Sequence, residues 1–108
     1  MNRIFDGLKV LDCASFIAAP AAATVLSDFG ADVIKIEPPS GDPYRQTYMA
    51  AGRPKTDRNY PWLIDARNKR SLAVDLGSAD GKTVLRRLVA TADVFITNYP
   101  APVRRKLG

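Results

Sequence analysis

The stretch PAAATVLSDFGADVIKIEPP, from Pro20 to Pro39, decides the fold of this chain. Its apolar side chains with helical spacing, which predict the inward face of a helix, are Ala22, Val25, Leu26 and Phe29. Gly30 is expected to end this helix, because glycine adopts the positive φ of a C-terminal cap at little cost. Residues 33–36, VIKI, then predict a buried strand, which the Pro-Pro pair at 38–39 ends. The stretch therefore predicts a helix that leads into a strand.

The flanking segments extend this unit into an α/β pattern. Residues 8–13 predict a strand before the helix, so that the two strands lie parallel with a right-handed crossover. Residues 71–76 predict another strand, Ser78 is expected to cap a helix, and residues 94–97 predict a short buried strand. The predicted inward face of the second helix is Val84, Leu85, Leu88, Val89 and Ala92. Residues 103–107 begin one more helix. We therefore predict the α/β class: a Rossmann-like open parallel sheet with flanking helices, incomplete within this chain.

Residues 38–68 interrupt this pattern. They are rich in proline and glycine, and four large aromatic side chains are spread among them: Tyr44, Tyr48, Tyr60 and Trp62. A long segment of this composition predicts an irregular loop, and a loop of this length inside a domain is usually functional. The aromatic side chains predict that the loop packs on a surface.

Composition limits the possible classes of protein. The chain has 108 residues, the size of one domain, and we treat residues 1–108 as one. No apolar run reaches the ~18 residues that span a bilayer, and the first residues lack the apolar core of a secretory signal. The single cysteine excludes an internal disulfide, so we expect a cytoplasmic protein without a membrane partner. The net charge of +5 either favours anionic partners or indicates a piece of a larger protein whose acidic residues lie in the remainder.

The carboxyl ends of the predicted strands are where an open parallel sheet binds ligands. This rule selects residues 12–18, 37–38, 75–78 and 98–100 as the candidate site. The turn at 18–20 lacks the G-x-G-x-x-G spacing of a dinucleotide site, and the sequence contains no Walker loop. The chain has no histidine, which excludes histidine-based catalysis and histidine metal ligands within it, and we predict no metal site.

Several polar side chains near these ends have two interpretations. Cys13 is expected to be an inert core thiol, because its strand is apolar and no cation can be named beside it. Asp12 and Glu37 are either site carboxylates or members of structural ion pairs. The polar runs at 68–70 and 104–106 are either phosphate clamps or solvated surface.

Five separated motifs together resemble the class III CoA-transferases (the CaiB/BaiF family). They are GLKVLD at 7–12, AAP at 18–20, LSDFGADVIKIEPPSGDPYR at 26–45, NKRSLAVDL at 68–76 and ADVFITNYPAPVRRKLG at 92–108. Their order and spacing agree with the family over essentially the whole chain. The resemblance implies that the chain is the N-terminal, Rossmann-like part of a longer CoA-transferase, whose relatives form interlocked homodimers.

The resemblance also implies a coenzyme A site. The positions that match CoA contacts of the family are Ile17, Ala18, Pro38, Val74, Asp75, Leu76, Gly77, Asn98, Tyr99, Pro100 and Lys106. Formyl-CoA transferases have a glutamine where Ile17 stands and an arginine where Pro38 stands, so we do not expect a formyl or oxalyl substrate. Pro100 likewise replaces a more usual glycine or arginine.

The expected activity is the transfer of CoA from an acyl-CoA donor to a carboxylic acid. The family's catalytic aspartate, which attacks the acyl-CoA and forms a covalent intermediate, matches a position beyond Gly108. We therefore assign no catalytic residue and expect these residues to be inactive alone. Two alternatives remain: part of an α-methylacyl-CoA racemase of the same superfamily, or a basic anion-binding or nucleic-acid-binding module. The sequence has no recognition motif for nucleic acid, so we predict no nucleic-acid partner.

Overall fold

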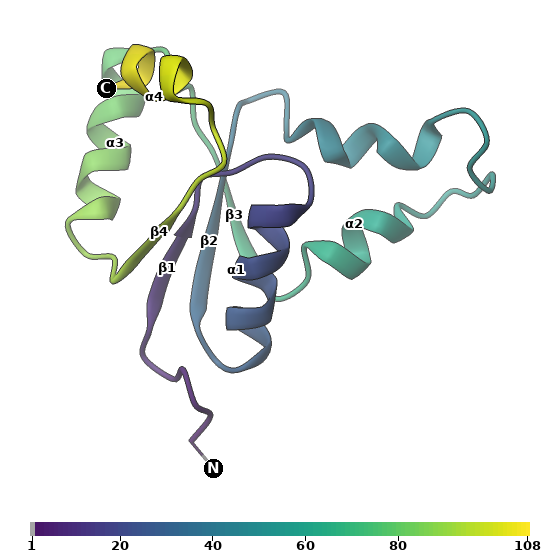
Figure 1. The fold of residues 1–108 in the computed structure, drawn as a ribbon, viewed down its shortest axis with the longest axis horizontal. Helices are drawn as coiled ribbons and strands as arrows, with labels where there is room; N and C mark the ends of the chain where they lie inside the picture. The colour runs from purple at the N-terminus through teal and green to yellow at the C-terminus, as the bar shows by residue number, and fades with distance from the viewer. Residues whose placement is uncertain (1) are drawn as a thin grey trace.

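The computed structural model describes residues 2–108. Within that range the chain forms a parallel sheet of four strands in the order β3–β2–β1–β4 (Figure 1). The strands are β1 (Lys9–Asp12), β2 (Asp32–Glu37), β3 (Lys69–Ala73) and β4 (Val94–Ile96). The predicted α/β class, with an open and wholly parallel sheet, is confirmed.

Two longer helices make two of the three crossovers of this sheet, and residues 38–68 make the third, from β2 to β3. The first, α1 (Ala18–Asp28), joins β1 to β2, and α3 (Ala79–Val89) joins β3 to β4 in the reverse direction. Since both crossovers are right-handed by the general rule for parallel strands, the two helices cover opposite faces. A last helix, α4 (Ala101–Leu107), lies beside α3 at the carboxyl end of the sheet (Figure 1). No helix within residues 2–108 is long and apolar enough to cross a membrane.

The core lies between α1 and the two central strands. Val10 pairs with Val33 on one side and Val94 on the other, and the buried cluster adds Ala23 and Ala31. β1 and β2 are therefore covered by neighbours on both edges, whereas β3 and β4 are the edge strands.

The predicted inward face of α1 is largely wrong. The buried side chains of this helix are Pro20, Ala23, Thr24 and Ser27. Of the predicted positions only Leu26 packs against the core, while Ala22, Val25 and Phe29 are exposed. Thr24 and Ser27 tolerate burial because their hydroxyls donate to the carbonyls of Pro20 and Thr24. Small side chains on this face also let the helix lie close to the sheet.

The predicted inward face of α3 is only half covered. Leu85, Leu88 and Ala92 are half-buried, whereas Val84 and Val89 are exposed. A cavity of about 530 Å³ lies between α3, β4 and α4, so Leu85 and Val89 line an opening instead of a packed interface.

Residues 38–68 contain two short helices where the sequence predicted an irregular loop. They are the 3₁₀-helix η1 (Pro43–Met49) and α2 (Tyr60–Asp65), which together form the arm that projects from the sheet in Figure 1. The side chains of Asp42 and Asn59 cap them by accepting from backbone N–H groups. Such caps make short helices possible even in a segment rich in proline.

Aromatic and polar contacts join the two halves of the arm. The Tyr44 hydroxyl donates to the Asp65 carboxylate, and the Asn59 amide donates to the Arg45 carbonyl at 2.7 Å. The Arg45 guanidinium lies 3.8 Å from the centroid of the Trp62 ring. These contacts explain why the arm is ordered without a large apolar core of its own.

Candidate functional site

The carboxyl ends of the four strands meet at one edge of the sheet, at the top of Figure 1. The strand order reverses between β1 and β4, and open α/β sheets bind ligands at such a switch point. The segments that gather there are 13–18, 37–38, 74–78 and 97–100. They coincide with the strand ends that the sequence selected.

A cavity of about 260 Å³ opens at this edge between the ends of β2 and β3 and helix α4. The predicted binding residues that line it are Pro38, Val74, Asp75, Leu76, Gly77 and Tyr99. The remaining predicted residues, which lie outside this lining, are Ile17, Ala18, Asn98, Pro100 and Lys106. The structure thus brings the β2, β3 and β4 ends together around one space, with the loop after β1 beside it.

The loop between β1 and α1 is held by Asn98 at the end of β4. The Asn98 amide nitrogen donates to the Ser15 carbonyl at 2.8 Å, and its oxygen accepts from the Ser15 N–H at 2.9 Å. The next residue, Phe16, has a φ of 63°, and Ile17 and Ala18 follow as the exposed start of α1. Asn98 therefore positions the loop in addition to any contact that it makes with a ligand.

Glu37, at the end of β2, is a fixed structural anion. Its buried carboxylate accepts two hydrogen bonds from Arg45 at 2.7 and 2.6 Å, one from the Asp42 N–H at 2.9 Å and one from the Ser71 hydroxyl at 2.7 Å. Burial alone raises the pKa of this carboxyl, but these donors outweigh burial and lower the pKa to about 2. The ion-pair interpretation of Glu37 is therefore the one that the structure supports.

The turn after β3 is built around Asp75. Its carboxylate accepts from the Gly77 N–H at 2.8 Å, and its carbonyl accepts from the Ser78 hydroxyl at 2.8 Å. The Ser78 oxygen in turn accepts from the Gly81 N–H at 2.9 Å, which confirms Ser78 as the cap of α3. Gly81 is required by a close approach, since a Cβ there would lie 1.8 Å from the Asp75 carbonyl oxygen. The turn that contributes Asp75 and Gly77 to the cavity wall is therefore held by its own hydrogen bonds.

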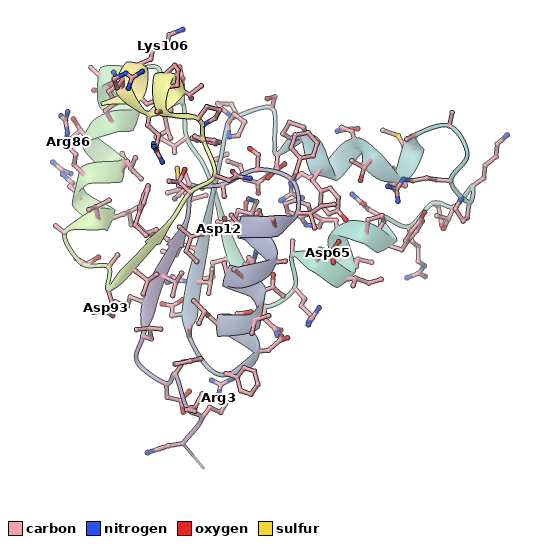
Figure 2. All side chains as sticks on the ribbon, viewed as in Figure 1. Arg3, Asp12, Asp65, Arg86, Asp93 and Lys106 are labelled. Carbon is pink, nitrogen blue, oxygen red and sulfur yellow. The ribbon has the colours of Figure 1, made fainter. Side chains whose placement is uncertain are left out.

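Tyr99 and α4 form the other wall of the cavity. Tyr99 is half-buried, and burial raises the pKa of its hydroxyl. Pro100 immediately precedes α4, whose exposed cations are Arg104, Arg105 and Lys106. Lys106 extends away from the sheet at the top of Figure 2, so its charge lies on the outer surface of α4.

Charged side chains buried beneath this edge are the main feature that the sequence analysis missed. Asp12 pairs with Lys69 at 2.9 Å and with Lys35 at 3.6 Å, and Lys35 pairs with Asp42 at 3.0 Å. The only signal in the sequence is Lys35, a cation inside an apolar strand. Of the two interpretations of Asp12, the structure supports the ion pair, whose closer partner, Lys69, lies 57 residues away in the chain.

The other polar candidates have structural roles. Lys69 is buried against Asp12, and Arg70 pairs with Asp32 at 2.7 Å, so the run at 68–70 does not form an open phosphate clamp. Cys13 is buried, and burial followed by the neighbouring Asp12 raises the pKa of its thiol to about 11. A thiol with such a pKa is a poor nucleophile at neutral pH, as expected from the sequence.

An open parallel sheet with a cavity at the carboxyl ends of its strands is the architecture of Rossmann-like domains. Comparison with known proteins makes this class specific. A model of "CoA-transferase family III" matches residues 5–108. The chain therefore belongs to CoA-transferase family III.

Individual relatives agree with this assignment. The chain is 42% identical over 108 residues to cinnamoyl-CoA:phenyllactate CoA-transferase of Clostridium sporogenes, covering 99% of this chain and 26% of that protein. It is 42% identical over 95 residues to the succinyl-CoA–L-malate CoA-transferase alpha subunit of Chloroflexus aurantiacus, covering 87% of this chain and 22% of that protein. A crystal structure of a CAIB/BAIF family protein from Brucella suis matches with a TM-score of 0.85 at 38% identity, over 99% of this chain and 29% of that chain. The chain thus spans about a quarter of the length of these relatives.

Proposed function

We propose that this chain supplies part of the coenzyme A binding surface of a CoA-transferase. The observation that supports the proposal most directly is the cavity at the carboxyl edge, which is lined by Pro38, the turn 74–77 and Tyr99. The same positions match CoA contacts in the family, and the sheet topology selects them independently of that resemblance.

The chemistry of the edge suits a ligand with a long neutral portion and charged phosphates. The cavity wall consists largely of backbone and apolar side chains, which suit the pantetheine portion of CoA. The cations of α4, Arg104, Arg105 and Lys106, are exposed nearby and favour the phosphates electrostatically. Ile17 and Ala18 begin α1, whose N-terminal N–H groups face the same edge. In this proposal the positions outside the cavity lining, including Asn98 and Pro100, contact the ligand once it is bound.

The proposed overall reaction moves CoA from an acyl-CoA donor to a carboxylic acid. The buried carboxylates beneath the edge, Asp12, Glu37 and Asp42, are all engaged with cations or backbone N–H groups. None of these three is free to attack a thioester, so we propose that residues 1–108 bind CoA but do not catalyse the transfer alone. The nonpolar residues at Ile17 and Pro38 argue against a formyl or oxalyl donor.

The relatives from Clostridium sporogenes and Chloroflexus aurantiacus support a transferase over a racemase, because both are CoA-transferases by name. Membership of this family also argues against the basic nucleic-acid module. From the resemblance we propose that the whole protein is an interlocked homodimer, and from the single cysteine we propose that it acts in the cytoplasm.

A titration of the ¹⁵N-labelled chain with CoA, followed by NMR, tests the proposal. We expect shifts at Ile17 and Ala18, in the turn 74–77 and at Asn98 and Tyr99. Tyr99→Leu should weaken these responses, whereas the matched variant Tyr48→Leu, on the arm, should leave them unchanged. No response at millimolar CoA, or equal responses over the whole chain, would contradict a site at this edge.

A further inference from the structure

Two pairs of opposite charges lie buried beneath the carboxyl edge. They involve Asp12, Lys35, Asp42 and Lys69, and each of these side chains is at most 2% exposed. Figure 2 shows Asp12 in the middle of the fold, near the end of β1. Buried ion pairs are weak contributors to stability, because desolvation offsets most of their attraction. Their presence therefore calls for an explanation other than stability.

The shortest contacts group the four side chains into two pairs, and a longer contact of 3.6 Å between Asp12 and Lys35 joins these pairs. The pair of Asp12 and Lys69, at 2.9 Å, contacts α1, because the Lys69 ammonium donates to the Pro20 carbonyl at 2.6 Å. That carbonyl has a second donor in the Thr24 hydroxyl. The pair of Lys35 and Asp42, at 3.0 Å, instead faces the loop after β1.

Lys35 and Asp42 each hold one backbone group of that loop. The Lys35 ammonium donates to the Ala14 carbonyl at 2.7 Å, and no other donor among residues 2–108 reaches this oxygen. The Asp42 carboxylate accepts from the Phe16 N–H at 3.3 Å and from the Tyr44 N–H at 2.9 Å. The pair therefore contacts the loop on both sides of Ser15.

The loop needs such support because its backbone is strained. Phe16 has a φ of 63°, in the left-handed region, and its side chain is about half exposed. An aromatic residue in this region costs about 1 kcal/mol or more and persists only where the surroundings enforce it. An exposed side chain makes few packing contacts of its own, so the backbone hydrogen bonds must enforce the conformation.

We propose that Lys35 and Asp42 are positioning residues that hold the Ala14–Phe16 loop in its left-handed form and thereby set the affinity for CoA. The inference rests on the proposed function, because the loop leads directly into Ile17 and Ala18. Asn98, after β4, forms two hydrogen bonds with Ser15 of the same loop. The loop is therefore held from the β2 side and from the β4 side of β1. Lys35 and Asp42 thus act on the proposed CoA site through the loop, without contacting the ligand themselves.

Two charge-balanced double variants test this role. Lys35→Met with Asp42→Asn removes the pair that faces the loop and leaves Asp12 paired with Lys69. Lys69→Met with Asp12→Asn removes the other pair and leaves the loop contacts in place. Both variants lose one buried cation and one buried anion, so a merely structural role predicts the same result for each.

We expect the first variant to bind CoA about tenfold more weakly by NMR titration, and the second to change affinity by less than about twofold. In the first variant the amides of Ser15 and Phe16 should also exchange with solvent faster than those of β1. Equal weakening in both variants, or unchanged affinity in the first, would overturn the proposal.

If a variant does not fold, hydrogen exchange of the unmodified chain still tests whether Lys35 and Asp42 hold the loop. The Phe16 amide should be protected to the same degree as the amides of β1, despite its place in an exposed loop. Rapid exchange of this amide would overturn the positioning role. If the unmodified chain binds no CoA, the proposed function fails, whereas the exchange measurement still decides whether the buried pair holds the loop.

Discussion

The two faces of the sheet differ in how completely they are covered. On the face of α1, Val10, Val33 and Ala23 are almost without solvent contact, and charged side chains are buried beside them. On the face of α3, a cavity of about 530 Å³ lies between the helix, β4 and α4, and it is lined by the exposed side chains of Val89 and Phe95. The face covered by α1 is therefore better packed than the face covered by α3, although α1 has the less regular apolar stripe.

Within residues 2–108, the apolar stripe of α3 is therefore not a packed interface. α3 has the clearer stripe, with Leu85, Leu88 and Val89 on one side and Arg86 and Arg87 on the other. α1 instead packs through small residues, which allow helix and strand to approach closely. Close approach, and not the number of large apolar side chains, decides which face is closed.

The largest expected effect comes from a tight backbone contact at the junction of β3 and α3. Gly81→Val would place a Cβ 1.8 Å from the Asp75 carbonyl oxygen, at the junction of β3 and α3. We expect a loss of about 3 kcal/mol of unfolding free energy, measured by urea denaturation, because backbone must move. Gly77→Ala is the matched control: its Cβ would meet only the Asp75 carboxylate, at 3.0 Å, and a similar loss there would contradict the explanation.

A pair of identical substitutions compares the two faces directly. Val33→Ala removes methyl groups from the closed side, where the residue is 1% exposed, and should cost about 2 kcal/mol. Val89→Ala removes the same groups from the wall of the open cavity, where the residue is 44% exposed, and should cost about 0.5 kcal/mol or less. Equal losses in thermal or urea unfolding would show that the α3 face is packed in solution.

The smallest effect concerns acid stability on the closed side. The folded-state pKa of Glu37 is lowered to about 2 from its ordinary 4.5, so the unfolded chain binds the proton first as the pH falls. The stabilisation is therefore complete above about pH 4.5 and is lost progressively as the pH falls toward 2.

Glu37→Gln should remove this part of the pH dependence and cost about 1.5 kcal/mol at neutral pH. Urea unfolding at a series of pH values measures both effects. Parallel curves for the variant and the unmodified chain across this acid range would show that Glu37 is not the group responsible. Ser71→Ala, which removes one donor and keeps the carboxylate, is the control that should retain the acid dependence.

The candidate site was predictable to the extent that it depends on strand ends. Pro38, the turn 74–77 and Tyr99 follow from local patterns and the rule for parallel sheets, and the structure places them around one cavity. The loop contact of Asn98 with Ser15 was not predictable, because it joins residues 83 positions apart whose proximity depends on β1 and β4 being neighbours. The helices of the arm were missed because their stability depends on the caps and cross-contacts of Asp42 and Asn59.

The sequence by itself determined the chain order of the four strands and of α1, α3 and α4, and the parallel arrangement of the strands. These features follow from local signals: the spacing of apolar residues, the helix caps, and the Gly and Pro residues that end helices and strands. Such signals can be identified without knowing which segments pack together. Only the tertiary structure decided which side of α1 is buried and that Lys35, Asp42 and Lys69 are buried with Asp12. A charge can be buried only where an opposite charge from a distant segment meets it, and that meeting exists only after the sheet has formed.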